Sequence, residues 1–93
     1  MNLVYTDEAI EDLKRLREFI AAHSPLVASR IATELVEKIS LLPEFPLMGV
    51  QVKLAPVPDS IRDMVFGKYV VRYSVHSSVI IILRVWHELE NER

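Results

Sequence analysis

Between Ile61 and His87 the chain contains three short runs of β-branched and aromatic residues, and this stretch limits the fold more than any other. The runs are Ile61–Phe66, Tyr69–Val75 and Val79–Trp86, separated by Gly67-Lys68 and by His76-Ser77-Ser78. Runs of this kind, interrupted by turn residues, are typical of strands that are joined by tight turns. The stretch therefore predicts a three-stranded antiparallel meander.

The turn at His76-Ser77-Ser78 decides which side chains share a face of that meander. A three-residue turn pairs Val75 with Val79 and leaves one face wholly apolar. The opposite face then carries a mixed set, namely Arg72, Ser74, Ile80, Ile82, Arg84 and Trp86. A two-residue turn would put Arg84 among the core residues, so we expect the longer turn. A face that combines cations with large apolar groups is a candidate surface for a partner.

Two amphipathic helices are predicted before the sheet. Thr6 or Asp7 is a suitable N-cap for the first helix, whose apolar stripe is Ile10, Leu13, Leu16 and Ile20, with Ala9 and Phe19 beside it. Ser24-Pro25 begins the second helix, whose stripe is Ala28, Ile31, Leu35, Ile39 and Leu42. So short a gap predicts an antiparallel helical hairpin over about residues 7–42, ended by Pro43.

Two more strands complete the predicted elements. They are Asn2–Tyr5 and Val50–Leu54; Gly49 allows the turn into the second, and Pro56 and Pro58 end it. We therefore predict an α+β fold, with an N-terminal strand and a helical hairpin packed on one face of a three- to four-stranded antiparallel meander. The sheet is expected over about residues 50–87 and a polar tail over 88–93, within one domain spanning 1–93.

The composition excludes several classes of protein. The chain is 51% hydrophobic and 26% charged, which is ordinary for a globular domain, and it has no cysteine for a disulfide or a thiolate metal site. Val79–Leu83 is the longest apolar run and is too short to cross a bilayer, so we expect a cytoplasmic protein that contacts no membrane. A net charge of −2 argues against direct sequence-specific DNA binding by the chain alone. His23 and His76 lack partners at ligand spacing, so no metal or cofactor is predicted.

The order of these elements and several short motifs resemble the RelE/ParE superfamily. The motifs are Leu41-Leu42-Pro43, Pro46, Gly49, Ile61-Arg62-Asp63, Gly67-Lys68-Tyr69-Val70-Val71-Arg72-Tyr73 and Ile82-Leu83-Arg84-Val85-Trp86-His87. The resemblance covers about Leu3 to Glu88. Members of this superfamily are toxins of type II toxin–antitoxin pairs, often labelled plasmid stabilisation proteins. The resemblance implies a toxin that a cognate antitoxin neutralises.

The superfamily has at least two activities, and the resemblance favours one of them. One branch cleaves messenger RNA on the ribosome; the other, similar to ParE, inhibits DNA gyrase by binding. Ribonuclease members place an arginine where this chain has Val70, and basic residues where it has Glu88, Leu89 and Glu90. Cleavage requires an acid or base and cations that stabilise the phosphate. We therefore expect a ParE-like protein that binds and does not catalyse.

Two alternatives remain open at this stage. The first is a RelE-like ribosome-dependent endonuclease, whose catalytic set would be Arg62, Arg72, Arg84 and His87. The second is an attenuated member that only binds antitoxin. For the leading hypothesis, we expect the antitoxin to contact Arg72, Ile80, Ile82, Arg84, Trp86 and His87.

Several of these residues also have plainer interpretations. The arginines can pair with neighbouring glutamates such as Glu88 or Glu90. His87 at a strand end is more often hydrogen-bonded to the backbone than catalytic. Tyr69 and Tyr73 are expected to pack against the helices.

Overall fold

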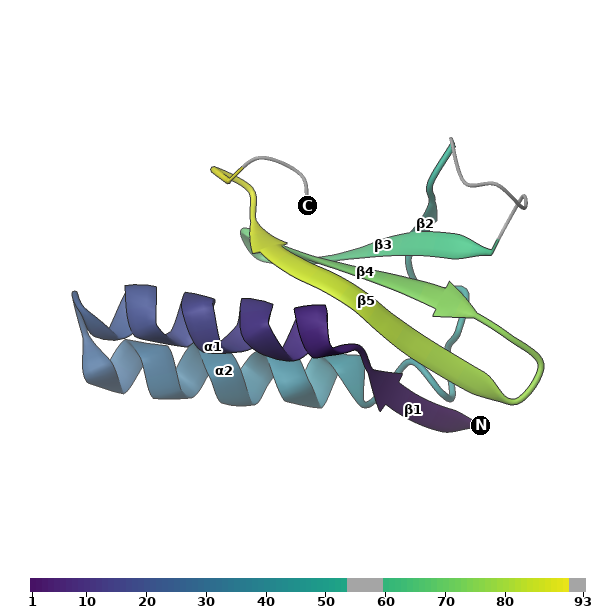
Figure 1. Cartoon of the computed structure of the whole chain (residues 1–93), viewed down its shortest axis with the longest axis horizontal. Helices are drawn as coiled ribbons and strands as arrows, with labels where there is room; N and C mark the ends of the chain where they lie inside the picture. Colours follow the sequence, from purple (N-terminus) through teal and green to yellow (C-terminus); the bar gives the residue numbers. More distant parts are fainter. Residues whose placement is uncertain (54–59, 91–93) are drawn as a thin grey trace.

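The computed structural model describes residues 1–53 and 60–90 and contains two helices and five strands. In chain order they are β1 (Asn2–Tyr5), α1 (Asp7–Ala21), α2 (Pro25–Ile39), β2 (Val50–Gln51), β3 (Ile61–Phe66), β4 (Tyr69–Val75) and β5 (Val79–His87). The helical hairpin lies along one face of the sheet and extends beyond its edge (Figure 1). The predicted two-layer α+β fold is therefore confirmed.

The helices begin where their capping residues predicted. The Thr6 hydroxyl accepts a hydrogen bond from the Ala9 N–H at 3.0 Å, and the Ser24 hydroxyl accepts one from the Val27 N–H at 3.3 Å. These bonds satisfy amides that have no partner within the first turn of a helix. The second helix ends at Ile39, and Leu42 follows in a tight turn, where its N–H donates to the Ile39 carbonyl.

The strand order in the sheet is β1-β5-β4-β3-β2, and the sheet is mixed. β3, β4 and β5 form the predicted antiparallel meander, whereas β1 joins the sheet as an edge strand parallel to β5. The expectation that the N-terminal strand packs on one face is corrected in this detail. β2 is only two residues long. The predicted end of this strand, at Leu54, Pro56 and Pro58, lies outside the described residues.

The predicted three-residue turn between β4 and β5 is wrong. Val75 pairs with Ile80, and the His76 N–H donates to the Val79 carbonyl, so the turn has two residues. A register shift follows: Tyr73 pairs with Ile82, but Arg72 pairs with Arg84. One extra residue on β5 forms this β-bulge, and a bulge inverts the alternation of side chains beyond it. The short turn therefore places Arg84 away from the core after all.

The bulge also corrects the predicted positions of Ile80 and Ile82. Both side chains are fully buried against the helices, with 0% exposure, and not on the opposite face. Tyr69 and Tyr73 face the helices as predicted, and both belong to the core. Arg72 and Arg84 share the other face, also as predicted, because they are directly paired across β4 and β5.

The two helical stripes were predicted with unequal success. Ala28, Leu35 and Ile39 of α2 are buried, as is Leu42 after it. In α1, Ala9 and Leu16 are buried, but Ile10 and Phe19 are 40% and 67% exposed. A carboxylate, that of Asp12, occupies the buried position between Ala9 and Leu16. Within the described residues, neither helix combines the length and apolarity that crossing a membrane would need.

Candidate interaction surface

One face of the sheet points away from the helical hairpin, and we call it the outer face. The strand register assigns to it alternate side chains of four strands, namely Val50, Ile61, Asp63, Val65, Val70, Arg72, Ser74, Ile81, Arg84 and Trp86. Val50 and Val65 are its most exposed apolar members, at 72% and 68%. The outer face therefore combines arginines, carboxylates and exposed valines.

Arg72 lies at the centre of the outer face and is held in a fixed orientation. Its Nε and Nη2 donate to the two carboxylate oxygens of Asp63 at 2.8 and 2.9 Å. Its guanidinium carbon lies 5.1 Å from the centroid of the Trp86 ring, a cation–π geometry. Trp86 is only 6% exposed. Arg72 therefore presents an ordered group whose charge a carboxylate of the same chain already balances.

Arg84 reaches past the edge of β5 to Asp12 of α1. Its Nε and Nη2 donate to the Asp12 carboxylate at 2.8 and 3.0 Å. The Val85 N–H and Arg15 Nη1 donate to the same carboxylate at 2.9 and 2.6 Å. Burial alone would raise the pKa of Asp12, but these hydrogen bonds outweigh it and lower the pKa to about 2. Asp12 is therefore ionised at neutral pH although it is 1% exposed.

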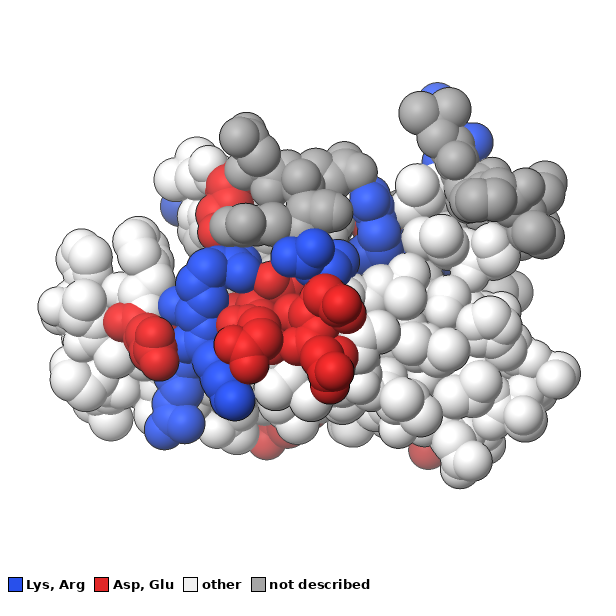
Figure 2. All heavy atoms as spheres, viewed as in Figure 1, with Lys and Arg blue, Asp and Glu red and all other residues white. Residues whose placement is uncertain are grey.

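Asp12 belongs to a set of side chains that satisfy the edge of β5 where β1 no longer pairs with it. β1 ends at Tyr5, which leaves backbone groups of β5 from Leu83 onward without a neighbouring strand. The side chains that bond to these groups are Thr6, Asp12, Arg15 and Glu90. Charged side chains accordingly gather over α1 and β5 in Figure 2. This edge of the sheet is closed by side chains of the chain itself.

Arg62 and His87 lie on the opposite side of the sheet from Arg72 and Arg84. Arg62 pairs with Tyr73 across β3 and β4, and its Nη1 donates to the Gly49 carbonyl at 2.8 Å. The His87 ring meets the Tyr69 ring edge-on, with the ring centroids 5.1 Å apart. The structure therefore does not bring together the four residues of the ribonuclease alternative.

The backbone role predicted for His87 is confirmed. Its Nδ1 accepts a hydrogen bond from the Leu89 N–H at 3.1 Å. A neutral imidazole with Nδ1 as acceptor carries its proton on Nε2. His87 thus orders the turn that follows β5.

The arginines were found from sequence, but their partners were not. The plainer interpretation offered Glu88 or Glu90 as partners, whereas Arg72 pairs with Asp63 and Arg84 with Asp12. Glu90 pairs instead with Arg15, at 3.2 Å. The position of Asp12 in the sequence could have indicated this pair. A carboxylate within an otherwise apolar helical stripe requires a partner when it is buried. Within residues 1–53 and 60–90, no three His, Asp or Glu side chains are grouped closely enough to hold a metal ion.

Comparison with known proteins identifies relatives over nearly the whole chain. A family model described as the ParE toxin of the type II toxin–antitoxin system parDE matches residues 3–92. Toxin RelE2 of Caulobacter vibrioides is 35% identical over 86 residues, which cover 91% of this chain and 92% of that protein.

Several solved structures share the fold. The chromosomal ParDE system from P. aeruginosa matches with a TM-score of 0.75 and 22% identity, covering 94% of this chain and 95% of that one. The RelBE2 toxin–antitoxin complex from Mycobacterium tuberculosis matches with a TM-score of 0.70 and 24% identity, covering 92% and 95%. With the family match over residues 3–92, these findings show that the chain belongs to the RelE/ParE superfamily and is a toxin of the type II toxin–antitoxin class.

Proposed function

We propose that this toxin acts in the cytoplasm by binding, as a ParE-like inhibitor of DNA gyrase, and that a cognate antitoxin neutralises it. One observation carries the proposal: each arginine of the ribonuclease alternative is engaged within the chain. Arg62 bonds to a backbone carbonyl, and Arg72 and Arg84 each form a two-bond pair with a carboxylate. Stabilising a phosphate in a transition state requires cations directed at the phosphate. Arginines already matched by carboxylates supply little of that stabilisation.

The residues after β5 support the same proposal. Glu88 and Glu90 lie in the turn that follows β5, and Glu90 is fixed there by Arg15 and by the His87 N–H. Carboxylates at this position repel a polyanion such as messenger RNA. A binding mechanism requires no cationic set there.

The proposed surface for the antitoxin is the outer face. Solved relatives include toxin–antitoxin complexes, among them RelB–RelE from Methanococcus jannaschii, with a TM-score of 0.54 to this chain. Ile80 and Ile82 are now excluded from that surface by their burial. The exposed apolar contacts are instead Val50 and Val65, beside the ordered guanidinium of Arg72.

The purified toxin is expected to inhibit supercoiling by purified gyrase, and equimolar antitoxin should restore it. Primer-extension mapping of messenger RNA after induction should show no codon-positioned cuts. Full supercoiling activity at toxin concentrations well above the antitoxin affinity would refute the gyrase proposal. Codon-positioned cuts would establish the endonuclease alternative, and normal growth with retained antitoxin binding would establish an attenuated toxin.

Val50→Asn is expected to weaken antitoxin binding by about tenfold, because it removes an exposed apolar contact from the outer face. Val50 is 72% exposed, so the substitution should leave the thermal stability of the toxin nearly unchanged. Leu26→Asn is the matched control, since Leu26 is 82% exposed on α2, away from the outer face. Isothermal titration of each variant with antitoxin makes the measurement. Equal affinities for the two variants would show that the antitoxin binds elsewhere.

A further inference from the structure

Within the described residues, each of the two long sides of the sheet leaves some backbone groups without a strand partner. At β1, the Asn2 and Thr6 N–H groups bond to the β5 side, so the alternate residues Leu3 and Tyr5 face away from β5. Side chains close the β5 edge where β1 no longer pairs with it, as described above. On the far side, β3 is covered by β2 over only part of its length, because β2 pairs with Arg62 and Asp63 alone. The remaining edge of β3 runs from Met64 to Phe66.

The register shows which backbone groups this edge exposes. The Val75 N–H donates to the Ser60 carbonyl, so the alternate residues Arg62, Met64 and Phe66 exchange hydrogen bonds with β4. The N–H and C=O of Ile61, Asp63 and Val65 therefore point away from β4. The Ile61 carbonyl accepts from the Val52 N–H at 3.0 Å, and Asp63 is paired with Val50. Among the described residues, the N–H and C=O of Val65 have no partner.

A fixed contact stops β2 before it reaches Val65. Met48 would be the next residue opposite Val65, but its N–H donates to the Phe45 carbonyl at 3.0 Å. The Tyr73 hydroxyl donates to the Pro46 carbonyl and accepts from the Gly49 N–H, each at 2.8 Å. These bonds hold the chain before β2 on the helix side of the sheet. The chain cannot continue along β3 without breaking them.

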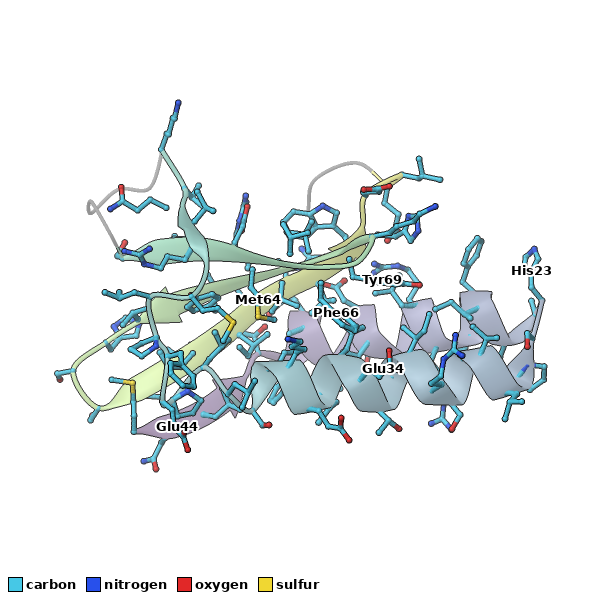
Figure 3. All side chains as sticks on the ribbon, turned by 180° about the vertical axis from the view of Figure 1, so that it is seen from behind. His23, Glu34, Glu44, Met64, Phe66 and Tyr69 are labelled. Carbon is cyan, nitrogen blue, oxygen red and sulfur yellow. The ribbon has the colours of Figure 1, made fainter. Side chains whose placement is uncertain are left out.

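A groove lies beside the open edge. It has a volume of about 640 Å³, and its walls are Phe66 of β3 and residues of α2 and the turn after it, namely Glu34, Glu37, Lys38, Ser40 and Leu41. Figure 3 shows Phe66 pointing from the sheet toward α2, near Glu34. An extended segment at this edge would direct alternate side chains into the groove and onto the outer face beside Val65.

The charge of the groove indicates the chemistry of the segment. Two carboxylates, Glu34 and Glu37, and one ammonium, Lys38, line the groove. Arg30 approaches Glu34 only at 4.0 Å, and both side chains are well exposed, so this pair neutralises little. A basic side chain on the incoming segment is therefore favoured. A second copy of this chain is disfavoured, because a symmetric edge-to-edge dimer would bring two acidic walls together.

We propose that an extended segment of the antitoxin pairs with β3 at Val65 as an added strand and presents a basic side chain to Glu34 and Glu37. This inference rests on the proposed function, because it takes the antitoxin as the source of the strand. Strand addition uses backbone hydrogen bonds for affinity and alternate side chains for specificity. The backbone N–H and C=O of Val65 are available for the hydrogen bonds, and the groove is available for the alternate side chains.

Val65→Pro tests the strand directly. Proline removes an N–H that the sheet itself does not use, and an edge strand tolerates proline at such a position. With the purified cognate antitoxin as probe, we expect the affinity to fall by at least about tenfold. Val65→Thr keeps the N–H and should bind within about threefold of the wild type. Wild-type affinity of Val65→Pro would overturn the proposal.

Amide hydrogen exchange tests the same strand without a substitution. In the free toxin the Val65 N–H should exchange rapidly, whereas those of Met64 and Phe66, bonded to β4, should be protected. In the complex we expect the Val65 exchange rate to fall at least about a hundredfold. An unchanged Val65 rate, or new protection at Leu3 and Tyr5 of β1 instead, would overturn the inference while leaving antitoxin binding intact. No antitoxin binding at all would refute the antitoxin part of the proposed function.

Charge reversal tests the groove. Glu37→Lys should weaken antitoxin binding by about tenfold at low salt, and by less as salt is raised. Glu18→Lys makes the same change of charge on an exposed residue of α1 outside the groove. Equal effects of the two substitutions would show that overall charge, and not the groove, determines the affinity.

Discussion

Asp12→Asn is expected to lower the free energy of unfolding by about 3 kcal/mol. The carboxylate balances Arg84 and Arg15 and accepts the Val85 N–H at the β5 edge. An asparagine of the same shape supplies no charge, and its NH₂ group faces donors. The arginine side chains are 31% and 35% exposed, so water recovers part of the loss and the cost stays below that of a fully buried pair. Urea unfolding with an unchanged m-value measures the effect.

The dependence of the free energy of unfolding on pH should reveal the protonation of the Asp12 carboxylate at acidic pH. The folded pKa of Asp12 is about 2, below the ordinary value of 3.8. A group whose pKa is lowered by folding contributes stability above its unfolded pKa and loses it as the pH falls through the folded value. The contribution of about 2 kcal/mol is thus complete above about pH 4 and disappears toward pH 2.

The Asp12→Asn variant should therefore lose less stability than the wild type between those pH values. Glu11→Gln is the matched control, because Glu11 is exposed and adjacent to Asp12 in the sequence. We expect its acid profile to follow that of the wild type. An acid limb in Asp12→Asn as steep as that of the wild type would show that other carboxylates govern acid unfolding.

Most of the fold could be predicted because its helix caps and turns depend on residues that lie within or next to each element. Thr6 and Ser24 cap the helices that their positions predicted, and Gly67 occupies the β3–β4 turn with a φ of 57°. The register of β5 could not be obtained in this way. The bulge inserts an apolar residue within an apolar run, so it leaves no mark in the pattern. Part of its support comes from α1, where Asp12 bonds to Val85 just beyond it.

The outer face could be predicted only in part for a related reason. Arg72 and Arg84 were placed correctly on one face because two one-residue differences cancel: the predicted turn is one residue too long, and the bulge that was not predicted shifts the register by one residue. Their partners depend on tertiary contacts: Asp63 is nine residues from Arg72, but Asp12 is 72 residues from Arg84. Hydrophobic periodicity carries no information about such pairs. The open edge at Val65 likewise depends on where β2 stops, which the Tyr73 hydroxyl decides.

Gly49→Ala is expected to cost about 2–3 kcal/mol of stability, more than a surface substitution should. A Cβ at this position would lie 2.8 Å from the Asp63 carbonyl oxygen and 2.9 Å from Cε1 of Tyr73. Neither atom can move freely, because Asp63 is paired with Val50 and the Tyr73 hydroxyl bonds to the Gly49 N–H.

The matched control is the other glycine of the chain. Gly67→Ala places its Cβ in open space, and its cost of about 1 kcal/mol comes from the left-handed backbone alone. Chemical unfolding of the two variants separates close approach from backbone conformation. Because Asp63 also holds Arg72, Gly49→Ala should in addition disturb the outer face and weaken antitoxin binding, which Gly67→Ala should not. A Gly49→Ala variant as stable as Gly67→Ala would mean that β2 can move away from β3, and the open edge at Val65 would then not be fixed by the chain that precedes it.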